Sequence, residues 1–193
     1  MIPASHEGRR RLIHFGSSVI PLGYWAIGRE TAIVMLAVMT ALMLLLELAR
    51  RRTILGRRFY QAFMGPVTRP EEERRLTGAS YVMVGDLAAA VLFTPTIAIL
   101  AMLFMSLGDP AAAYLGQRYG RTAIGEKSLE GGLGCFVVCF LLTLPAGLSL
   151  AVSVGGAAGA SIAELLPRRW LNDNLTMPII SGAFMTLLQG AGQ

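Results

Sequence analysis

The sequence predicts an all-α integral membrane protein that crosses the bilayer about seven times. Of its 193 residues, 54% are hydrophobic and 15% are charged, whereas soluble domains carry about a quarter charged residues. The apolar residues form runs long enough to cross the hydrocarbon layer, the clearest of them from 31 to 49. Since this length leaves no room for a separate soluble domain, we expect residues 1–193 to form one membrane-embedded domain.

Prolines, glycines and charged residues divide the apolar sequence into predicted spans. The fourth span can continue as a helix to Tyr119, and the third contains Asp86, for which we expect a buried, hydrogen-bonded structural role. Two cysteines, Cys135 and Cys139, lie four apart in the fifth span without other ligand-type residues, so metal binding by them is not expected. The approximate ranges are 12–28, 31–49, 79–93, 96–107, 128–144, 148–166 and 174–190.

The distribution of basic residues predicts the orientation of these spans. With the N-terminus inside, all the Lys and Arg residues except Arg29 fall in four cytoplasmic segments, as the positive-inside rule requires. Those segments are about 1–11, 50–78, 117–127 and 167–173. The protein is then expected to be an integral membrane protein whose active site faces the cytoplasm, in the inner or plasma membrane if the source is prokaryotic. The formal charge of +5 favours lipid headgroups over nucleic acid, because the arginines cluster beside apolar segments.

The segment 50–78 is the main polar region, with eight arginines and the acidic run from Glu71 to Glu73. Its apolar residues have amphipathic spacing, which predicts a short helix lying on the membrane surface. These residues are Ile54, Leu55, Phe59, Tyr60, Phe63 and Met64. A solvated loop whose arginines only set the topology is the alternative.

The residues from 108 to 132 suggest a metal and nucleotide site at the membrane surface. Asp109 follows a purely apolar run, glycines recur, and Lys127 lies near the end of the segment. Glycine lets a backbone approach an anion closely. A lysine supplies a positive charge for phosphate and an aspartate can hold a divalent cation. The alternatives are an ordinary cytoplasmic loop and, for Gly116 and Gly120, close helix packing.

Three motifs resemble the CTP-dependent polyprenol kinase family, which comprises dolichol kinases, phytol kinases and a CTP-using diacylglycerol kinase. The first motif consists of Gly108, Asp109, Gly116, Gly120, Lys127, Ser128, Glu130 and Gly131 in this order and spacing. The second consists of Glu164 and Pro167, followed by Asn172, Asp173, Asn174 and Pro178. The third and weakest is Arg10 and Arg11 followed by His14. In the second motif Asn172 stands where the family has a carboxylate, which leaves Asp173 as the only acid of that cluster.

The resemblance implies a set of site residues, all on the cytoplasmic side of the predicted topology. The catalytic residues would be Asp109, Lys127, Asp173, Glu164 and His14, with Asp109, Glu130 and Asp173 holding Mg²⁺. The nucleotide would contact Gly108, Gly116, Gly120, Lys127, Ser128, Glu130, Gly131, Asn172 and Asn174. Either Glu164 or Asp173 could accept the proton of an alcohol.

Each assignment has a structural alternative. Asp109 could satisfy backbone donors at a helix end, and Lys127 could extend to the interface. Glu130 and Asp173 could stabilise helix N-termini. His14 could lie at a helix interface, hydrogen-bonded to one of the acids.

The expected function is transfer of the γ-phosphoryl group of CTP to an isoprenoid alcohol, such as a polyprenol, dolichol or phytol, at the cytoplasmic interface. CTP as donor is implied by the resemblance alone. One alternative is a cytidylyltransferase similar to CDP-diacylglycerol synthase, which has a similar glycine-rich stretch. The other is a small transporter that uses intramembrane charges such as Asp86 and Glu47. A nucleoside triphosphate, a lipid alcohol and the bilayer are the expected partners, and a homo-oligomer is compatible with the sequence.

Overall fold

A computed structural model describes residues 14–65, 75–166 and 172–191, and almost all of its secondary structure is helical. The N-terminal half contains α2 (Val19–Ile27), α3 (Arg29–Arg52), α4 (Ile54–Met64) and α5 (Gly78–Leu92). The middle contains α6 (Pro95–Leu103), a π-helical turn η3 (Phe104–Gly108) and α7 (Asp109–Tyr119). The remaining elements are a short hairpin, β1 (Ala123–Ile124) and β2 (Lys127–Ser128), then α8 (Leu129–Thr143), a 3₁₀ turn η4 (Leu144–Ala146), α9 (Leu150–Leu165) and α10 (Asp173–Ala191).

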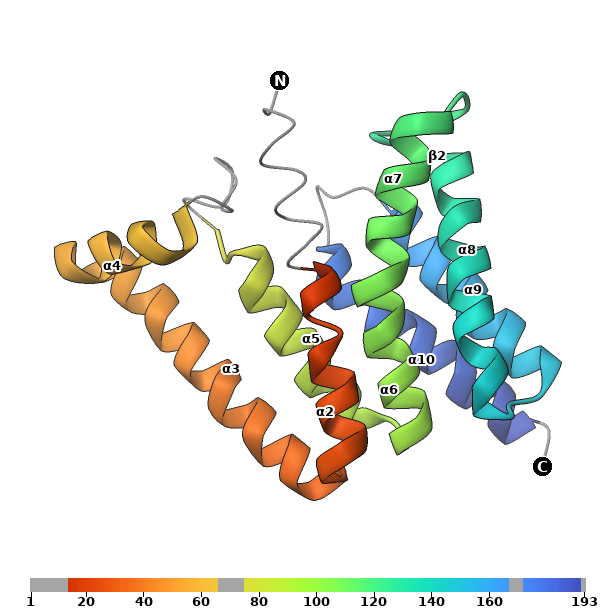
Figure 1. Cartoon of the computed structure of the whole chain (residues 1–193), viewed down its shortest axis with the longest axis horizontal. Coiled ribbons are helices and arrows are strands. Elements are labelled where there is room, and N and C mark those ends of the chain that lie inside the picture. The colour runs from red at the N-terminus through yellow and green to blue at the C-terminus, as the bar shows by residue number, and fades with distance from the viewer. Residues whose placement is uncertain (1–13, 66–74, 167–171, 192–193) are drawn as a thin grey trace.

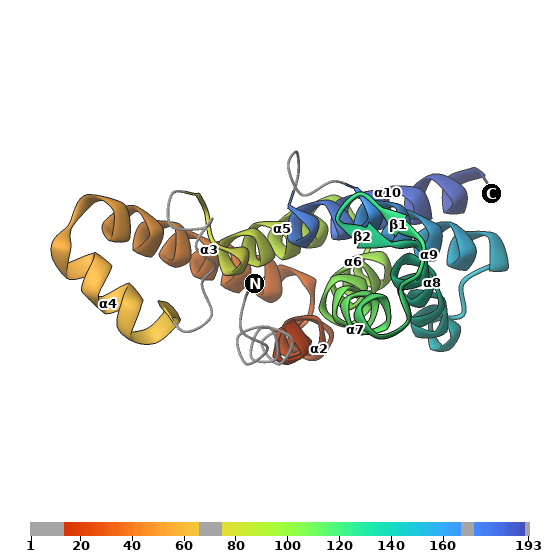
Figure 2. The same ribbon diagram turned by 90° about the horizontal axis from the view of Figure 1, so that it is seen from above.

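The helices from α5 onward form a bundle, and α3 and α4 extend from it as an arm (Figures 1 and 2). Helix α10 packs against α9, α5 and α6, while α8 packs between α7 and α9. The core between them is apolar and holds Phe104, Ile97, Met102, Met177 and Met185, all with less than 2% of their surface exposed. Many apolar side chains of α3, by contrast, are exposed. An apolar surface outside an apolar core is the pattern of a protein solvated by lipid.

By length and composition, three helices among the described residues can cross a membrane: Arg29–Arg52, Pro95–Tyr119 and Leu129–Ala146. Two shorter apolar helices are Gly78–Leu92 and Leu150–Leu165. The all-α prediction is therefore confirmed apart from the small hairpin, and a helix lies in each predicted apolar range. Seven spans and a cytoplasmic N-terminus stay predictions.

Helix α4 lies in the segment where an amphipathic helix was predicted, so this part of the chain is helical rather than a loop. Several sequence-based expectations fall outside the described residues. These are Arg10 and Arg11 of the third motif, the acidic run from Glu71 to Glu73, and Pro167 of the second motif.

The helix Pro95–Tyr119 contains the π-helical turn η3 just before Asp109. Pro110 follows Asp109, and a proline inside a helix lacks an N–H and crowds the carbonyl of the preceding turn. The wider turn accommodates that proline and shifts the helical register by one residue. Asp109 is thereby presented as the first residue of α7, buried to 6% exposure.

The glycine-rich segment is mostly helix, as expected if the fourth span continues to Tyr119 and the fifth begins near residue 128. Gly116 lies inside α7, and Gly120 follows its last residue. Gly131 lies in the first turn of α8. The loop between them reduces to the β1–β2 hairpin, with Gly125 at a positive φ of 60° in its turn. Because Gly116 lies inside a helix, its position favours a role in close helix packing, which was the alternative to a phosphate-binding role.

The connections alternate between the two ends of the bundle, which gives a direct test of topology. The α2–α3, α5–α6 and α8–α9 connections lie at the lower end in Figure 1, and the hairpin between α7 and α8 lies at the upper end. In a Cys135→Ala/Cys139→Ala background, we expect an impermeant maleimide to label Glu126→Cys only from the cytoplasm. Glu30→Cys and Pro145→Cys should be labelled only from the opposite side. Labelling of all three positions from one side would contradict the predicted spans.

Candidate active site

Three buried carboxylates from three helices meet near the upper end of the bundle. Asp109, Glu164 and Asp173 each offer an oxygen atom, and these atoms lie within 4.8 Å of one another. Their residues are 6%, 4% and 5% exposed. Three acids at this separation repel one another strongly unless positive charge is placed among them. A cationic partner among the acids relieves this repulsion.

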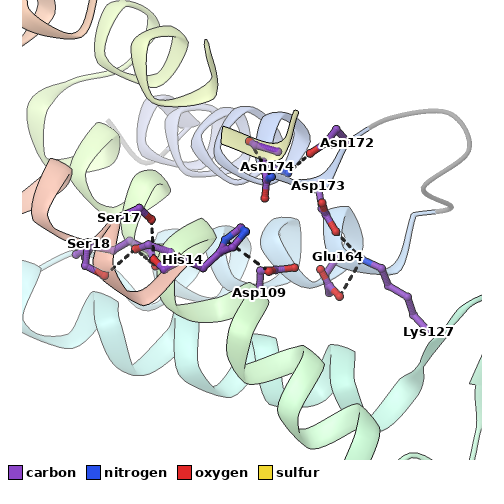
Figure 3. A network of polar contacts seen from close by, with 12 residues as sticks. His14, Ser17, Ser18, Asp109, Lys127, Glu164, Asn172, Asp173 and Asn174 are labelled. Atoms are coloured by element: carbon purple, nitrogen blue, oxygen red, sulfur yellow. Dashed lines mark hydrogen bonds and ion pairs between the residues drawn. The ribbon is translucent and has the colours of Figure 1, made fainter. Parts of the chain in front are cut away.

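Lys127 supplies part of that charge from β2. Its Nζ lies 2.8 Å from Oε1 of Glu164 and 3.2 Å from Oδ2 of Asp173, to which it donates a hydrogen bond. The lysine thus joins the end of α9 to the start of α10, as Figure 3 shows. One ammonium group against three carboxylates leaves the cluster formally anionic.

Local structure at the helix ends fixes the acids. Asn172 is the residue before α10, and its Oδ1 accepts the backbone N–H of Asn174 at 3.0 Å. This is a helix N-cap, so the cap is Asn172 and not Asp173, whose side chain is released to bind Lys127. Glu164 lies in the last turn of α9 and is directed inward.

His14 lies on the other side of Asp109 from Lys127 (Figure 3). Its Nδ1 is 3.7 Å from Oδ2 of Asp109, and the residue is 5% exposed. The imidazole is close enough for an ion pair when it is protonated. The sequence analysis named a histidine paired with an acid at a helix interface as the alternative to a catalytic His14. The contact with Asp109 matches that alternative, and it also puts the imidazole ring beside the carboxylate cluster.

Two oxygens of the cluster are available for a cation. Among the residues that the structure describes, Oδ1 of Asp109 and Oε2 of Glu164 are buried and have no hydrogen-bond partner. Buried acceptors without partners are costly, and hard divalent cations prefer carboxylate oxygens as ligands. The donor set of Asp109, Glu164 and Asp173 therefore fits Mg²⁺.

A cavity of about 340 Å³ opens beside this cluster, between α7, the hairpin and the start of α8. Lys127 and Glu164 belong to its wall, so the cavity reaches the carboxylates. Its other lining residues are Ala112, Ala113, Gly116, Gln117, Gly120, Arg121, Ala123, Glu126, Ser128, Gly131 and Gly132. The N-terminus of α8 favours an anion nearby, and the wall combines glycine backbone with basic side chains. The cavity is therefore suited to a phosphorylated ligand.

The glycines of the wall hold α7 and α8 close together. A Cβ atom on Gly131 would lie 2.9 Å from the carbonyl oxygen of Ala112, and one on Gly116 would lie 2.8 Å from Oγ of Ser128. Such contacts are too short for real side chains, so these positions admit only glycine without a shift of backbone or cap. The motif spacing thus serves helix packing and cavity shape together.

Several predicted residues lie apart from the cluster. The carboxylate of Glu130 accepts the N–H of Thr122 at 3.1 and 3.2 Å, so the geometry groups Glu164 rather than Glu130 with the other two acids. Gly108 is buried in the core, where a Cβ would lie 2.7 Å from Sγ of Cys139, and it does not line the cavity.

Ser128 and Asn174 have structural contacts of their own. Ser128 caps α8 through its Oγ, which accepts the N–H of Gly131 at 3.1 Å, while its residue still lines the cavity. The Nδ2 of Asn174 donates to the carbonyl of Gly78 and ties α10 to α5.

Two features were missed from the sequence. Gln117, Arg121 and Glu126 line the cavity but had no motif to single them out; only the shortness of the loop could have indicated them. Asp86 is buried, but neither carboxylate oxygen has a hydrogen-bond partner in the described part of the chain, so the expected hydrogen bonds are not seen there.

Comparisons with known proteins give three relatives. The chain is 25% identical over 183 residues to an uncharacterised protein of Rickettsia prowazekii, covering 90% of each chain. It is 28% identical over 151 residues to CTP-dependent diacylglycerol kinase 1 of Schizosaccharomyces pombe, covering 68% of this chain and 69% of that protein. It is 23% identical over 211 residues to CTP-dependent diacylglycerol kinase 1 of Saccharomyces cerevisiae, covering 93% of this chain and 72% of that protein.

The two named relatives support the CTP-dependent lipid kinase family. They do not extend that support to dolichol or phytol kinases specifically. Together with the apolar helices, they indicate an integral membrane protein. No protein-family profile and no solved structure matches the chain.

A divalent cation at the three acids should stabilise the purified protein. A ligand that binds only the folded state, at a hundred times its Kd, adds about 2.7 kcal/mol to the free energy of unfolding. We expect millimolar Mg²⁺ to raise the Tm of the wild-type protein in detergent. Asp109→Asn and Glu164→Gln should remove most of this shift.

Glu130→Gln is the matched control, because Glu130 was the ligand that the sequence suggested. The geometry predicts that this variant keeps the Mg²⁺-dependent shift in Tm. If the Mg²⁺-dependent shift in Tm is lost in Glu130→Gln and retained in Glu164→Gln, the metal ligands are Asp109, Glu130 and Asp173, as the sequence suggested.

Proposed function

We propose that this protein is a membrane lipid kinase that transfers the γ-phosphoryl group of CTP to the primary hydroxyl of a lipid alcohol. The observation that supports this most is that Lys127 and Glu164 line a glycine-rich cavity, and that Glu164 belongs to a cluster of three buried acids with Asp109 and Asp173. Phosphoryl transfer depends mainly on positioning and on neutralising the charge of the phosphates. CTP as donor rests on the two named relatives.

The residues have distinct roles in this proposal. Lys127 would exchange part of its contact with Glu164 and Asp173 for the phosphates of a nucleotide in the cavity. Asp109, Glu164 and Asp173 would hold Mg²⁺. The ion, when bound, supplies positive charge to the phosphate oxygens. The walls at Gly116, Gly120 and Gly131 would let the nucleotide approach the backbone closely.

The acceptor would approach from the His14 side, because the cavity and Lys127 occupy the other side of Asp109. Its hydroxyl oxygen forms a bond to the γ-phosphorus while the bond from that phosphorus to the β–γ bridging oxygen breaks, which releases CDP. The hydroxyl proton passes to a basic group of the cluster. The pair of His14 and Asp109, whose Nδ1 and Oδ2 atoms lie 3.7 Å apart, would hold this proton.

We propose diacylglycerol as the acceptor, because both named relatives are diacylglycerol kinases. An isoprenoid alcohol, expected from the sequence, is the second candidate. Both are bilayer lipids with one primary hydroxyl at the interface, so a site at the helix ends can reach either. The geometry of the described residues favours neither acceptor.

Charge removal at the cluster should abolish most of the activity. Loss of one preorganised electrostatic contact typically lowers kcat by roughly 100-fold to 1,000-fold. We expect Lys127→Met and Asp109→Asn to lose activity to this extent while remaining folded in detergent. Asp86→Asn makes the same chemical change at a buried aspartate of α5, and we expect it to alter stability more than turnover. Wild-type turnover in the first two variants would contradict a catalytic role for Lys127 and Asp109. Lys127 would then only help to set the membrane topology.

Labelled CTP distinguishes the kinase from a cytidylyltransferase. Purified protein with Mg²⁺ is incubated with diacylglycerol, prenols, phytol or phosphatidate and with CTP labelled at the α or the γ phosphorus. We expect γ-label in a lipid monophosphate, strongest with diacylglycerol, and no α-label in lipid. The α-label in lipid, with release of pyrophosphate, would instead identify a cytidylyltransferase. If no label is transferred to any acceptor, the transporter is the remaining alternative, and uptake assays in liposomes would test it.

A further inference from the structure

Helix α4 lies at the end of the arm, far from the candidate site (Figures 1 and 2), and several of its large apolar side chains are exposed. Ile54 and Leu55 are 77% and 80% exposed, and Phe59, one turn later, is 53% exposed. Large apolar residues at this exposure on an amphipathic helix need an apolar partner outside the described fold.

The same helix carries an excess of positive charge. No acidic residue occurs between Leu48 and Pro70 in the sequence. Arg51 and Arg52 at the end of α3, and Arg57 and Arg58 on α4, are exposed. Their partner should therefore combine apolar and anionic character, which is the combination that an anionic lipid surface offers.

The geometry of α3 sets the depth of α4. The 24 residues of α3 are about 36 Å long at 1.5 Å per residue, which exceeds the ~30 Å hydrocarbon thickness. Its final turn of Arg50, Arg51 and Arg52 therefore reaches the headgroups. Only Thr53 separates α3 from α4, so the first turn of α4 starts at headgroup depth.

Buried polar contacts hold α4 at this position. Arg50 donates to Glu47 at 2.7 Å, and its guanidinium lies 4.7 Å from the centre of the Tyr60 ring of α4. Oε1 of Glu47 accepts the N–H of Thr77 at 3.0 Å, which ties the same group to the start of α5. The nearly buried pair thus links three helices, and the candidate active site does not use it.

A tight turn fixes the angle between α3 and α4. Thr53 Oγ1 caps α4 by accepting the N–H of Gly56 at 3.0 Å. A Cβ on Gly56 would lie 2.5 Å from the carbonyl of Ala49, so α4 folds back closely on the end of α3. The one-residue connection and these contacts give α4 a defined orientation relative to α3.

We propose that α4 is a fixed interfacial anchor that binds anionic phospholipid headgroups of the leaflet at the Arg52 end of α3. Leu55 and Phe59 enter the acyl region, while Arg57 and Arg58 contact lipid phosphates. The proposal does not depend on the kinase reaction. It depends only on α3 crossing the bilayer, as the length and composition of that helix support.

Quenching by spin-labelled lipids tests the proposal in nanodiscs. A fluorophore is attached to Leu55→Cys or to Gln61→Cys in the Cys135→Ala/Cys139→Ala background. The two positions lie about 120° apart around α4, and both residues are exposed. We expect acyl-chain doxyl lipid to quench position 55 several times more strongly than position 61. Equal quenching would contradict insertion of this face.

Headgroup selectivity is the second measurement. At equal mole fraction, doxyl-phosphatidylglycerol should quench position 55 at least about threefold more than doxyl-phosphatidylcholine, since each basic residue near an anionic surface is attracted to it. Arg57→Gln/Arg58→Gln should remove this excess, while Arg29→Gln, at the other end of α3, should preserve it. Equal quenching by the two lipids would overturn the anionic preference. If the fluorophore is shielded from both lipids only in discs that hold two copies of the protein, this face of α4 contacts a second copy of the chain instead of lipid.

Discussion

The contact of Lys127 with Glu164 and Asp173 is the interaction on which the site depends. It joins the hairpin, the end of α9 and the start of α10, segments that lie far apart in the sequence. Without the ammonium group, three buried carboxylates would face one another in a low-dielectric interior, where such repulsion is large. One lysine does not balance three acids, so the same contact that organises the site also leaves it ready for a second cation.

Helix packing at glycine positions brings these charges together. Gly116 and Gly131 let α7 and α8 approach until backbone meets backbone, which places the hairpin and Lys127 over the end of α9. On the other side, a Cβ on Gly85 would lie 2.5 Å from the carbonyl of Asn174, so α5 and α10 are equally close. Small residues are the usual means of helix association in lipid, where no hydrophobic force drives helices together.

The chain has two polar centres with different character. The carboxylate cluster is anionic and adjoins a cavity. The Glu47–Arg50 pair is internally balanced, hydrogen-bonded to Thr77 and stacked on Tyr60. A balanced and satisfied pair holds elements in place, whereas a cluster with buried oxygens lacking partners among the described residues is suited to ligand binding. This contrast separates the candidate active site from the anchor of the arm.

Sequence patterns by themselves determined the helical class and the approximate helix ranges. The residues Asp109, Lys127, Glu164, Asp173 and His14, which meet near one end, were implied by the family resemblance. The helix ranges could be predicted because spans depend on local apolar composition, and the site residues could be predicted because the motifs that contain them resemble those of a known family. Only the tertiary structure decided that Glu164 and not Glu130 joins the acids, and that Gly108 packs in the core. These outcomes depend on which faces of distant helices meet, and a one-residue shift in the π-helical turn before Asp109 is enough to change the face that a side chain occupies.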